Sequence, residues 1–299
     1  MPSELLTVGV ATPGNLGPPC ARAPASAGHR VLTSTQGRSE RSVKRAQGAG
    51  MEVVTDAVLA KEADVFLSIL PPKDAVALAV RFVSAHAALD APRVDPLIYA
   101  DCNAVSPDTT RMMEQIVTAA GMRYVDASIV GGPPNPDTEY KPRFYCSGAH
   151  AEALEALGET LDVRVLSDEV GDASGLKMCY GAVTKGISAI ATQALVSSRA
   201  LGVEDALRAE FSSSLPDWYP VFERAIGRVP LKAHRWVGEM EEISTTFGSV
   251  GMDPLLFKGA ANTYRFLASK GGELLDPELA PERRALSEAL KTLAHALER

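Results

Sequence analysis

Apolar runs of strand length alternate with amphipathic segments over residues 1–170 of the chain. Eight runs qualify as strands: Leu5–Ala11, Arg30–Thr35, Met51–Val54, Val65–Leu70, Leu97–Cys102, Arg123–Ala127, Arg143–Ser147 and Val163–Leu166. The segments between them have helical patterns: Glu40–Gly48, Asp56–Glu62, Asp74–Ala88, Pro107–Ala120 and Ala151–Leu161. Alternation of this kind predicts an α/β domain in which helices cover both faces of a parallel sheet.

The pattern changes at Asp172. The segment Asp172–Leu201 has no proline and is mostly small or apolar, which predicts one helix about 45 Å long. Only helical patterns follow it: Val203–Leu215, Pro220–Ala225, Pro230–Phe247, Asp253–Ser269 and Pro281–Glu298. We therefore expect a doubly wound sheet domain over residues 1–170, a long interdomain helix, and an all-α domain for substrate and dimerisation over residues 171–299.

Composition and charge narrow the class of protein. The 299 residues are 46% hydrophobic and 22% charged, as in ordinary globular proteins. With a net charge of −7, neither nucleic acid nor an anionic membrane is expected as a partner. We find no secretion-signal pattern and no run near the roughly 20 apolar residues of a membrane span. Four scattered cysteines predict reduced thiols in a cytoplasmic protein, and no metal site is expected.

A glycine-containing turn follows the first predicted strand. Its residues are Thr12, Pro13, Gly14, Asn15, Leu16 and Gly17. Gly14 and Gly17 match the last two glycines of the G-x-G-x-x-G fingerprint, which brings the main chain close to a pyrophosphate at a helix N-terminus. Thr12 stands where the first glycine is usual, and an ordinary glycine-rich turn is the alternative. The position after an N-terminal strand favours a dinucleotide-binding Rossmann domain.

The end of the second strand indicates which dinucleotide binds. An acidic residue there would hold the ribose hydroxyl of NAD, but Thr35, Arg38 and Ser39 precede the first acid, Glu40. A cation and hydroxyl groups suit the 2′-phosphate of NADP, so NADP is predicted over NAD. Leu70, Pro71 and Asn103 follow later strands and are expected at the same cofactor cleft, because ligands bind at the carboxyl ends of the strands.

Two further segments are candidates for the chemistry. Ser128, Val130, Gly131 and Gly132 lie in a turn where substrate could meet main-chain amides, with a plain loop as the alternative. In the long helix, Tyr180, Gly181, Thr184 and Ser188 fall within about 60° of Lys177. This face offers an ammonium, a phenol and two hydroxyls to a ligand, although a lysine extending along an apolar helix into water would look the same.

These motifs resemble the β-hydroxyacid dehydrogenase and 6-phosphogluconate dehydrogenase superfamily. The nearer match is a phosphogluconate-dehydrogenase-like branch that has a helical C-terminal domain of unknown function. Its first turn, x-P-G-x-x-G, is similar to Thr12–Gly17, and its helix motif, A-S-x-L-K-M-x-Y-x-x-x-T-K-G, is similar to Ala173–Gly186. The resemblance implies that Lys177 is catalytic and acts on the substrate hydroxyl during hydride transfer. Desolvation on an apolar helix would bring the pKa of such a lysine towards the range of proton transfer.

Two departures from the superfamily pattern leave the substrate open. Gly181 stands where the superfamily has asparagine, and Tyr180 beside it is expected to take over part of that role, which makes it a second catalytic candidate. Val130 stands where the superfamily has serine before the two glycines, and Ser128 points to the same side if the segment is extended.

The leading hypothesis is an oxidoreductase that transfers a hydride between NADP(H) and a hydroxy acid or a related alcohol or carbonyl, with Lys177 as the proton-transfer residue. An imine reductase is the second, although those related enzymes lack a lysine at this position. A nucleotide-binding protein without chemistry is the third. His234 and Arg235 are candidates for an anionic substrate. The amphipathic C-terminal helices, and the superfamily's habit of pairing through such helices, predict a homodimer.

Overall fold

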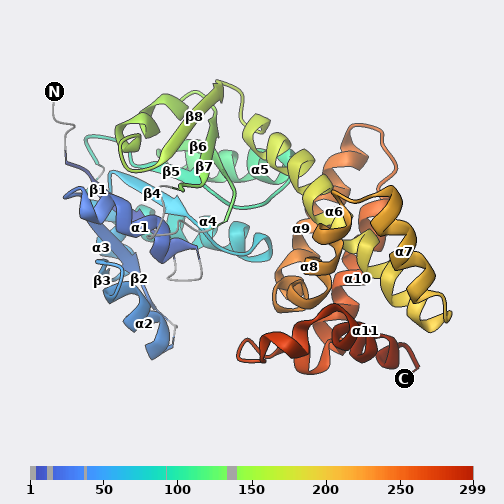
Figure 1. Ribbon diagram of the computed structural model, residues 1–299. Coiled ribbons are helices and arrows are strands. Elements are labelled where there is room, and N and C mark those ends of the chain that lie inside the picture. The colour runs from blue at the N-terminus through green and yellow to red at the C-terminus, as the bar shows by residue number, and fades with distance from the viewer. Residues whose placement is uncertain (1–4, 12–15, 37–38, 92, 133–139, 299) are drawn as a thin grey trace. The chain divides into compact units, whose positions relative to one another are not determined.

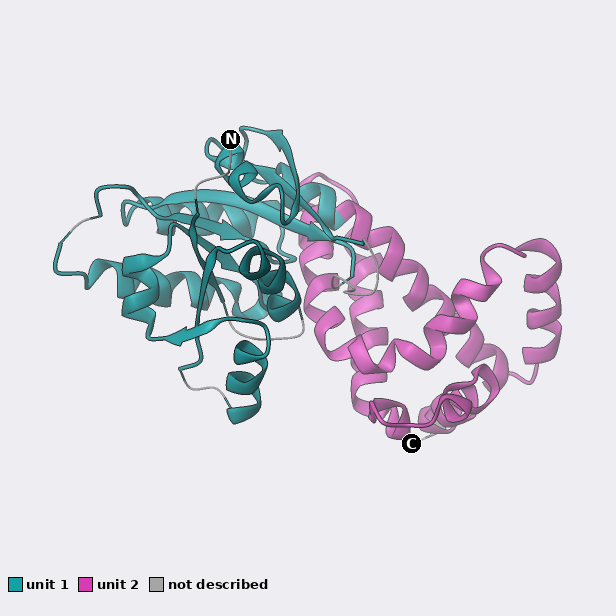
Figure 2. Cartoon of the chain, turned by 60° about the vertical axis from the view of Figure 1, so that its left-hand side comes forward, with its two compact units in different colours: residues 1–178 teal, residues 179–299 magenta. Residues whose placement is uncertain are grey.

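The computed structural model covers residues 1–299 and describes all of them except residues 1–4, 12–15, 37–38, 92, 133–139 and 299. The chain forms two compact units, residues 1–178 and residues 179–299 (Figure 2). The division falls inside the long helix α6, Asp172–Ala200, which has nearly the bounds expected from the sequence. It lies eight residues beyond the expected domain boundary at residue 170, because the first turns of α6 pack with the sheet unit.

Eight described strands make one sheet, in the order β3-β2-β1-β4-β5-β6-β7-β8 (Figure 1). Their bounds are β1 Thr7–Val10, β2 Arg30–Ser34, β3 Glu52–Val54, β4 Val65–Ser68, β5 Ile98–Asp101, β6 Arg123–Val130, β7 Arg143–Ser147 and β8 Asp162–Ser167. The order around β1 and β4 is that of a doubly wound sheet, so the fold class expected from the alternating pattern is confirmed.

The expectation of a wholly parallel sheet is wrong at one edge. β1 to β6 pair in parallel, but β7 runs antiparallel to β6, and β8 is parallel to β7. The cause lies in the connection, residues 131–142, which is rich in glycine and proline. Such a sequence favours a return of the chain over the helical crossover that a parallel neighbour needs.

Helices cover both faces of the sheet. The helices of this unit are α1 Gly17–Ser26, α2 Glu40–Gln47, α3 Asp56–Glu62, α4 Pro72–Ala87, α5 Pro107–Thr118 and the 3₁₀ helix η1 Ala151–Leu157. One core packs α1, α2 and η1 against the sheet, and the other packs α3, α4 and α5. In the second core, the Tyr99 ring lies 5.3 Å from Phe66 and 6.0 Å from Tyr124, so aromatic side chains span three neighbouring strands.

The second unit consists of the remainder of α6 and the helices that follow it. They are α7 Glu204–Ser214, α8 Tyr219–Arg228, α9 Pro230–Ser249, α10 Leu255–Lys270, η2 Gly272–Leu275, η3 Pro281–Arg284, α11 Leu286–His295 and η4 Ala296–Glu298. The single C-terminal helix expected over Pro281–Glu298 is therefore divided, because Ala285 has the extended backbone angles φ −55° and ψ 147°. Edge-to-face contacts of Trp236 with Tyr264 and of Phe247 with Phe257 join α9 to α10. Within the described residues, no helix has the length and apolar content that crossing a bilayer requires.

Candidate active site

A row of four polar side chains crosses the sheet of the first unit, at the carboxyl ends of β4, β5 and β7 and in the middle of β6. Ser68 is in register with Asp101, Asp101 with Asp126, and Asp126 with Ser147 of the antiparallel strand β7. All four residues are completely buried. We call these four residues the polar row. Because buried polar groups are costly unless they are hydrogen-bonded, the partners of the row show what it organises.

Asp126 holds the first turn of α6. Its Oδ2 accepts hydrogen bonds from the main-chain amides of Gly171 (3.1 Å) and Ser174 (2.9 Å), and its Oδ1 accepts one from the Ser174 hydroxyl at 2.9 Å. The Ser147 hydroxyl donates to the same carboxyl at 3.4 Å and accepts from the amide of Ala173 at 3.1 Å. A carboxyl at a helix N-terminus satisfies unpaired amides and favours the helix dipole. The polar row therefore fixes the start of the helix that carries Lys177.

Lys177 lies against the main chain immediately after β5. Its Nζ donates to the carbonyl oxygens of Asn103 at 3.0 Å and Cys102 at 3.3 Å. Carbonyl acceptors stabilise a protonated amine, so this contact orients Lys177 as a proton donor at the carboxyl end of a central strand.

The Asn103 side chain joins the ends of two strands. Its Nδ2 donates to Ser68 Oγ at 2.9 Å and, through a short hydrogen bond, to Asp101 Oδ1. Its Oδ1 accepts from the amide of Leu70 at 2.7 Å. Both amide protons of Asn103 are thus used within the protein, and its role at the cofactor stays a prediction.

The two carboxyl groups of the row have perturbed pKa values. Burial, followed by the neighbouring charge of Asp126, raises the pKa of Asp101 from 3.8 to about 7. Burial also raises the pKa of Asp126, while the hydrogen bonds from Ser174 and Gly171 act in the opposite direction. The positive charge of Lys177 lowers the pKa of both carboxyls. Strongly perturbed groups of this kind are typical of functional sites.

The nucleotide turn is described only from Leu16 onward. Thr12, Pro13, Gly14 and Asn15, and Arg38 after β2, lie outside the described residues. Leu16 is the N-cap of α1, which makes no side-chain capping hydrogen bond, and Gly17 opens the helix. Pro18 and Pro19 have no N–H to offer, so among the described residues at this terminus the amides of Leu16 and Gly17 are the ones that suit a phosphate. An uncapped helix N-terminus directly after β1 and a glycine-containing turn fits a dinucleotide pyrophosphate.

The other predicted cofactor residues lie at strand ends, as expected. Thr35 is half-buried directly after β2, and Ser39 is the N-cap of α2 with its hydroxyl 3.3 Å from that of Ser42. Leu70 and Pro71 follow β4, and Pro71 is the N-cap of α4. The places of these residues agree with the expected cleft, and their contacts with a cofactor stay predictions.

The predicted substrate turn is shorter than expected, because β6 continues to Val130. Ser128 and Val130 are therefore strand residues on one face and both are buried, and no described residue hydrogen-bonds the Ser128 hydroxyl. Gly131 has φ +121°, and a Cβ there would collide with the hydroxyl of Tyr140. That hydroxyl lies 3.0 Å from the Gly132 amide, which donates to it.

In the second unit, the expected polar face of α6 is only partly available to a ligand. Tyr180 is 52% exposed, but the Thr184 hydroxyl donates to the Tyr180 carbonyl of its own helix, and Ser188 is buried. Gly181 is buried, and a Cβ there would lie 3.3 Å from Ile243 and 3.6 Å from Lys185 Nζ. Of the candidates on α9, His234 is exposed and Arg235 is half-buried.

Sequence reasoning missed Lys185 and Glu239 as partners. Their charged groups lie 2.6 Å apart, and Lys185 Nζ lies 5.9 Å from the centre of the Trp236 ring. The ion pair is mostly buried and connects α6 with α9. The sequence does carry one signal for this pair, since Lys185 belongs to the T-K-G end of the helix motif.

Comparison with known families shows to which family the chain belongs. Residues 7–163, more than half of its length, match the NAD binding domain of 6-phosphogluconate dehydrogenase. The chain belongs to this family, which confirms the resemblance inferred from the first turn and the long helix. Residues 199–267 match a domain of unknown function, DUF1932.

One curated relative and three solved structures show the extent of the similarity. An uncharacterized 28.5 kDa protein in the 7S RNA 5′ region of Methanothermus fervidus is 29% identical over 179 residues, covering 59% of this chain and 65% of the relative. The chain thus aligns with less than two thirds of that relative's length.

Among the structures, a conserved protein of unknown function, described as structurally similar to 3-hydroxyacid dehydrogenases, is 27% identical, with a TM-score of 0.63 over 88% of this chain and 97% of its own. 3-Hydroxyisobutyrate dehydrogenase of Mycobacterium tuberculosis, with L-serine, is 18% identical, with a TM-score of 0.68 over 99% of this chain and 100% of its own. A reductive aminase of Aspergillus terreus, in complex with NADPH, is 14% identical, with a TM-score of 0.55 over 98% and 99%. The last two share the fold.

Proposed function

We propose that the chain is an oxidoreductase that transfers a hydride between NADP(H) and a hydroxy acid or a related alcohol or carbonyl. The observation that carries this proposal is the placement of Lys177, whose Nζ is held by the carbonyls of Cys102 and Asn103 directly after β5. In doubly wound sheets the ligand lies at this end of the strands. Membership of the 6-phosphogluconate dehydrogenase NAD-binding family supports the cofactor class.

The chain's own part in the reaction is to bind, orient and supply a proton. A bound nicotinamide supplies or accepts the hydride. In the reducing direction, the Lys177 ammonium donates a hydrogen bond and then its proton to the carbonyl oxygen, where negative charge develops. In the oxidising direction the same amine receives the hydroxyl proton. The carbonyls of Cys102 and Asn103 orient Nζ in both directions. A substrate contact of Gly131 and Gly132 stays a prediction, because the Gly132 amide donates to the Tyr140 hydroxyl in this structure.

NADP is proposed over NAD from the residues after β2. Thr35, Arg38 and Ser39 provide hydroxyls and a cation, and the first acid, Glu40, already belongs to α2. The NADPH complex of the reductive aminase adds a neighbour in which this fold binds that nucleotide.

The same neighbour favours a second candidate, the reduction of an imine. Such a substrate requires a proton at nitrogen, which Lys177 or Tyr180 would provide. The substrate screen must therefore contain imines formed from ketones and amines, together with hydroxy acids and their carbonyl partners.

The test begins with fluorescence titration of NADPH and NADH. We expect NADPH to bind more tightly, and Arg38→Ala to weaken NADPH several-fold while leaving NADH nearly unchanged. Arg41→Ala, in the exposed first turn of α2, is the matched control and should bind NADPH like the wild type. If neither nucleotide binds at micromolar concentration, the proposal is wrong.

Lys177→Met then separates binding from chemistry. It should keep nucleotide binding but lower turnover of the best substrate by about 10²-fold or more, the usual scale of general acid–base catalysis. A variant that binds NADPH and keeps wild-type turnover would exclude Lys177 from proton transfer.

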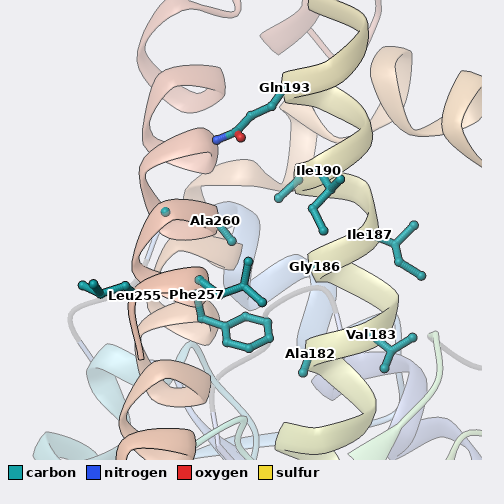
Figure 3. A pocket seen from close by; sticks show the side chains of 12 residues that line it. Ala182, Val183, Gly186, Ile187, Ile190, Gln193, Leu255, Phe257 and Ala260 are labelled. Carbon is teal, nitrogen blue, oxygen red and sulfur yellow. The ribbon is translucent and has the colours of Figure 1, made fainter. Parts of the chain in front are cut away.

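We also propose that a second copy of the chain covers an apolar groove between α6 and α10. The groove has a volume of about 400 Å³, and Figure 3 shows Val183, Ile190 and Leu255 among its walls. Val183, Ile190, Leu255 and Leu256 are each 57% to 64% exposed. Among the described residues, those that line the groove include no charged side chain, and Gln193 donates to Thr263 within the unit. A monomer rarely exposes such a surface, and a twofold axis would pair the groove with its own copy.

A further inference from the structure

Asp101 is the one member of the polar row whose purpose the proposed reaction leaves open. Its residue is completely buried on β5, and its Oδ1 accepts the short hydrogen bond from Asn103 Nδ2. Within the described part of the chain, no group donates to its Oδ2. A buried carboxyl oxygen without a partner is costly, so a stable fold alone would favour an apolar residue here.

The contacts of Asp101 lead to Lys177 in two steps. Asp101 and Ser68 hold the two protons of the Asn103 amide, and Leu70 holds its oxygen, so the side chain is fixed at three points. The main chain of Asn103 is fixed with it. The carbonyl of this same residue accepts from Lys177 Nζ at 3.0 Å.

We propose that Asp101 is a positioning residue for Lys177: it fixes the Asn103 turn whose carbonyls orient the lysine, and its charge retains the proton on Nζ. This role deepens the function proposed above and rests on it, because it concerns the same proton donor. A purely structural carboxyl would fix the turn without any effect of its charge on Nζ.

Among the titratable groups around Asp101, the Asp101 carboxyl itself is the one whose charge changes near neutral pH. The titratable groups that face it are Tyr99 and Cys102 from β5 and the residue after it, Tyr124 and Asp126 from β6, and Lys177 from α6; Ser68 of β4 is neutral. Burial raises the pKa values of Tyr99, Tyr124 and the Cys102 thiol above their ordinary values, so all three stay uncharged near neutral pH. The groups that can carry a charge near neutral pH are therefore the carboxyls of Asp101 and Asp126 and the ammonium of Lys177. Asp126 has four hydrogen-bond donors and keeps its charge more readily, so Asp101 is the group that gains or loses a proton near pH 7.

The test measures how fast Lys177 Nζ is acetylated by an N-hydroxysuccinimide ester in the full-length protein. Peptide mass spectrometry gives the rate at pH 6 and pH 8, normalised to the exposed Lys73 of α4, and Lys177→Met identifies the peptide. Only an unprotonated and accessible amine reacts, so the rate reports both the hold on Nζ and the retention of its proton. Neither cofactor nor substrate is needed, and a failed substrate screen would leave this measurement intact.

Two variants of Asp101 separate shape from charge. Asp101→Asn keeps an acceptor for Asn103 but removes the charge, so acetylation should be roughly threefold faster or more than in the wild type at pH 8, and equal to it at pH 6. Asp101→Leu removes the acceptor as well and should accelerate acetylation at both pH values. Any other pattern, above all wild-type rates in both variants, overturns the proposal. If Asp101→Leu does not fold, as judged by circular dichroism, the pH-dependent difference in Asp101→Asn decides alone.

Discussion

Asp101 and Asp126 lie in register on the neighbouring strands β5 and β6, and both side chains are completely buried. Two carboxylates in a medium of low dielectric constant raise the free energy of each other's charged form, so the pair favours holding a proton. Hydrogen bonds decide which carboxyl holds it. Asp126 is surrounded by donors from α6 and β7, whereas Asp101 has the Asn103 amide, and the proton therefore belongs mainly to Asp101.

The stability of the protein should depend on pH through Asp101. In the unfolded chain this carboxyl has its ordinary pKa of 3.8, and in the folded protein the pKa is about 7. Between these values the folded state binds the extra proton, so the contribution of Asp101 to stability is present below pH 4 and is lost as the pH rises to 7. From pH 5 to pH 8, we expect a loss of about 2 to 3 kcal/mol in the free energy of unfolding.

Urea denaturation of the wild type and of Asp101→Asn at pH 5 and pH 8 measures this contribution. Between pH 5 and pH 8, the free energy of unfolding of Asp101→Asn should fall by about 2 to 3 kcal/mol less than that of the wild type, because asparagine does not titrate. Asp172→Asn, which changes an exposed carboxyl in the first turn of α6, should keep the wild-type dependence. Equal pH dependence in all three proteins would show that Asp101 does not hold a proton near neutral pH.

Removal of the Asp126 carboxyl should weaken the start of α6. Asp126→Ala leaves the amides of Gly171 and Ser174 and the Ser174 hydroxyl without their acceptor. We expect the free energy of unfolding to fall by about 2 to 4 kcal/mol, measured by urea denaturation at pH 7. Asp172→Ala, in the same turn but exposed, should cost less than about 1 kcal/mol. Similar losses in the two variants would mean that Asp126 is not the cap.

The two glycines after β6 should differ in their tolerance of a side chain. Gly131→Ala places a Cβ at φ +121° against the Tyr140 hydroxyl, and we expect a cost of about 1 to 3 kcal/mol in thermal or urea unfolding. Apart from its chain neighbours, no described residue has an atom within 4 Å of the position that a Cβ at Gly132 would occupy, so Gly132→Ala should change stability by less than about 0.5 kcal/mol. Equal effects of the two substitutions would contradict the strained geometry at Gly131.

A charge in the α6–α10 groove should prevent self-association. Ile190→Glu places a carboxylate among apolar side chains, and light scattering after size-exclusion chromatography should show a monomer where the wild type is a dimer. Leu201→Glu is the matched control, because Leu201 is 76% exposed and does not line the groove. A monomeric wild type, or a dimer that survives Ile190→Glu, would exclude the groove as the contact between copies.

Much of the fold follows from the hydrophobic pattern. The runs that predict strands correspond to β1 to β8 within a few residues, and Asp172–Leu201 matches α6. The direction of β7 could not be read from its own residues, because Arg143–Ser147 looks the same in a parallel or an antiparallel pair. The glycine- and proline-rich sequence of residues 131–142 is the feature that favours the antiparallel direction. Likewise, an amphipathic run does not tell a regular α-helix from the 3₁₀ turns of η1 and η4.

The candidate site was predictable only in part. Lys177 was found because it is a single cation on a small and apolar helix face within a specific motif. The polar row was missed, because each member reads alone as the polar end of a strand. A repeated pattern of aromatic, any residue and polar could have revealed it: Phe66-Leu67-Ser68, Tyr99-Ala100-Asp101, Tyr124-Val125-Asp126 and Tyr145-Cys146-Ser147. Which strands become neighbours, and hence which polar ends meet, is decided by tertiary pairing.

The polar row also limits how this protein can evolve. A mutation of Ser68 alone leaves an Asn103 proton without one of its acceptors, and a mutation of Ser147 alone removes a donor to Asp126. Each change is therefore tolerated best when its neighbour changes as well. Among descendants of a common ancestor, the four positions of the polar row should therefore vary together, while the residues of the covering helices vary independently of one another.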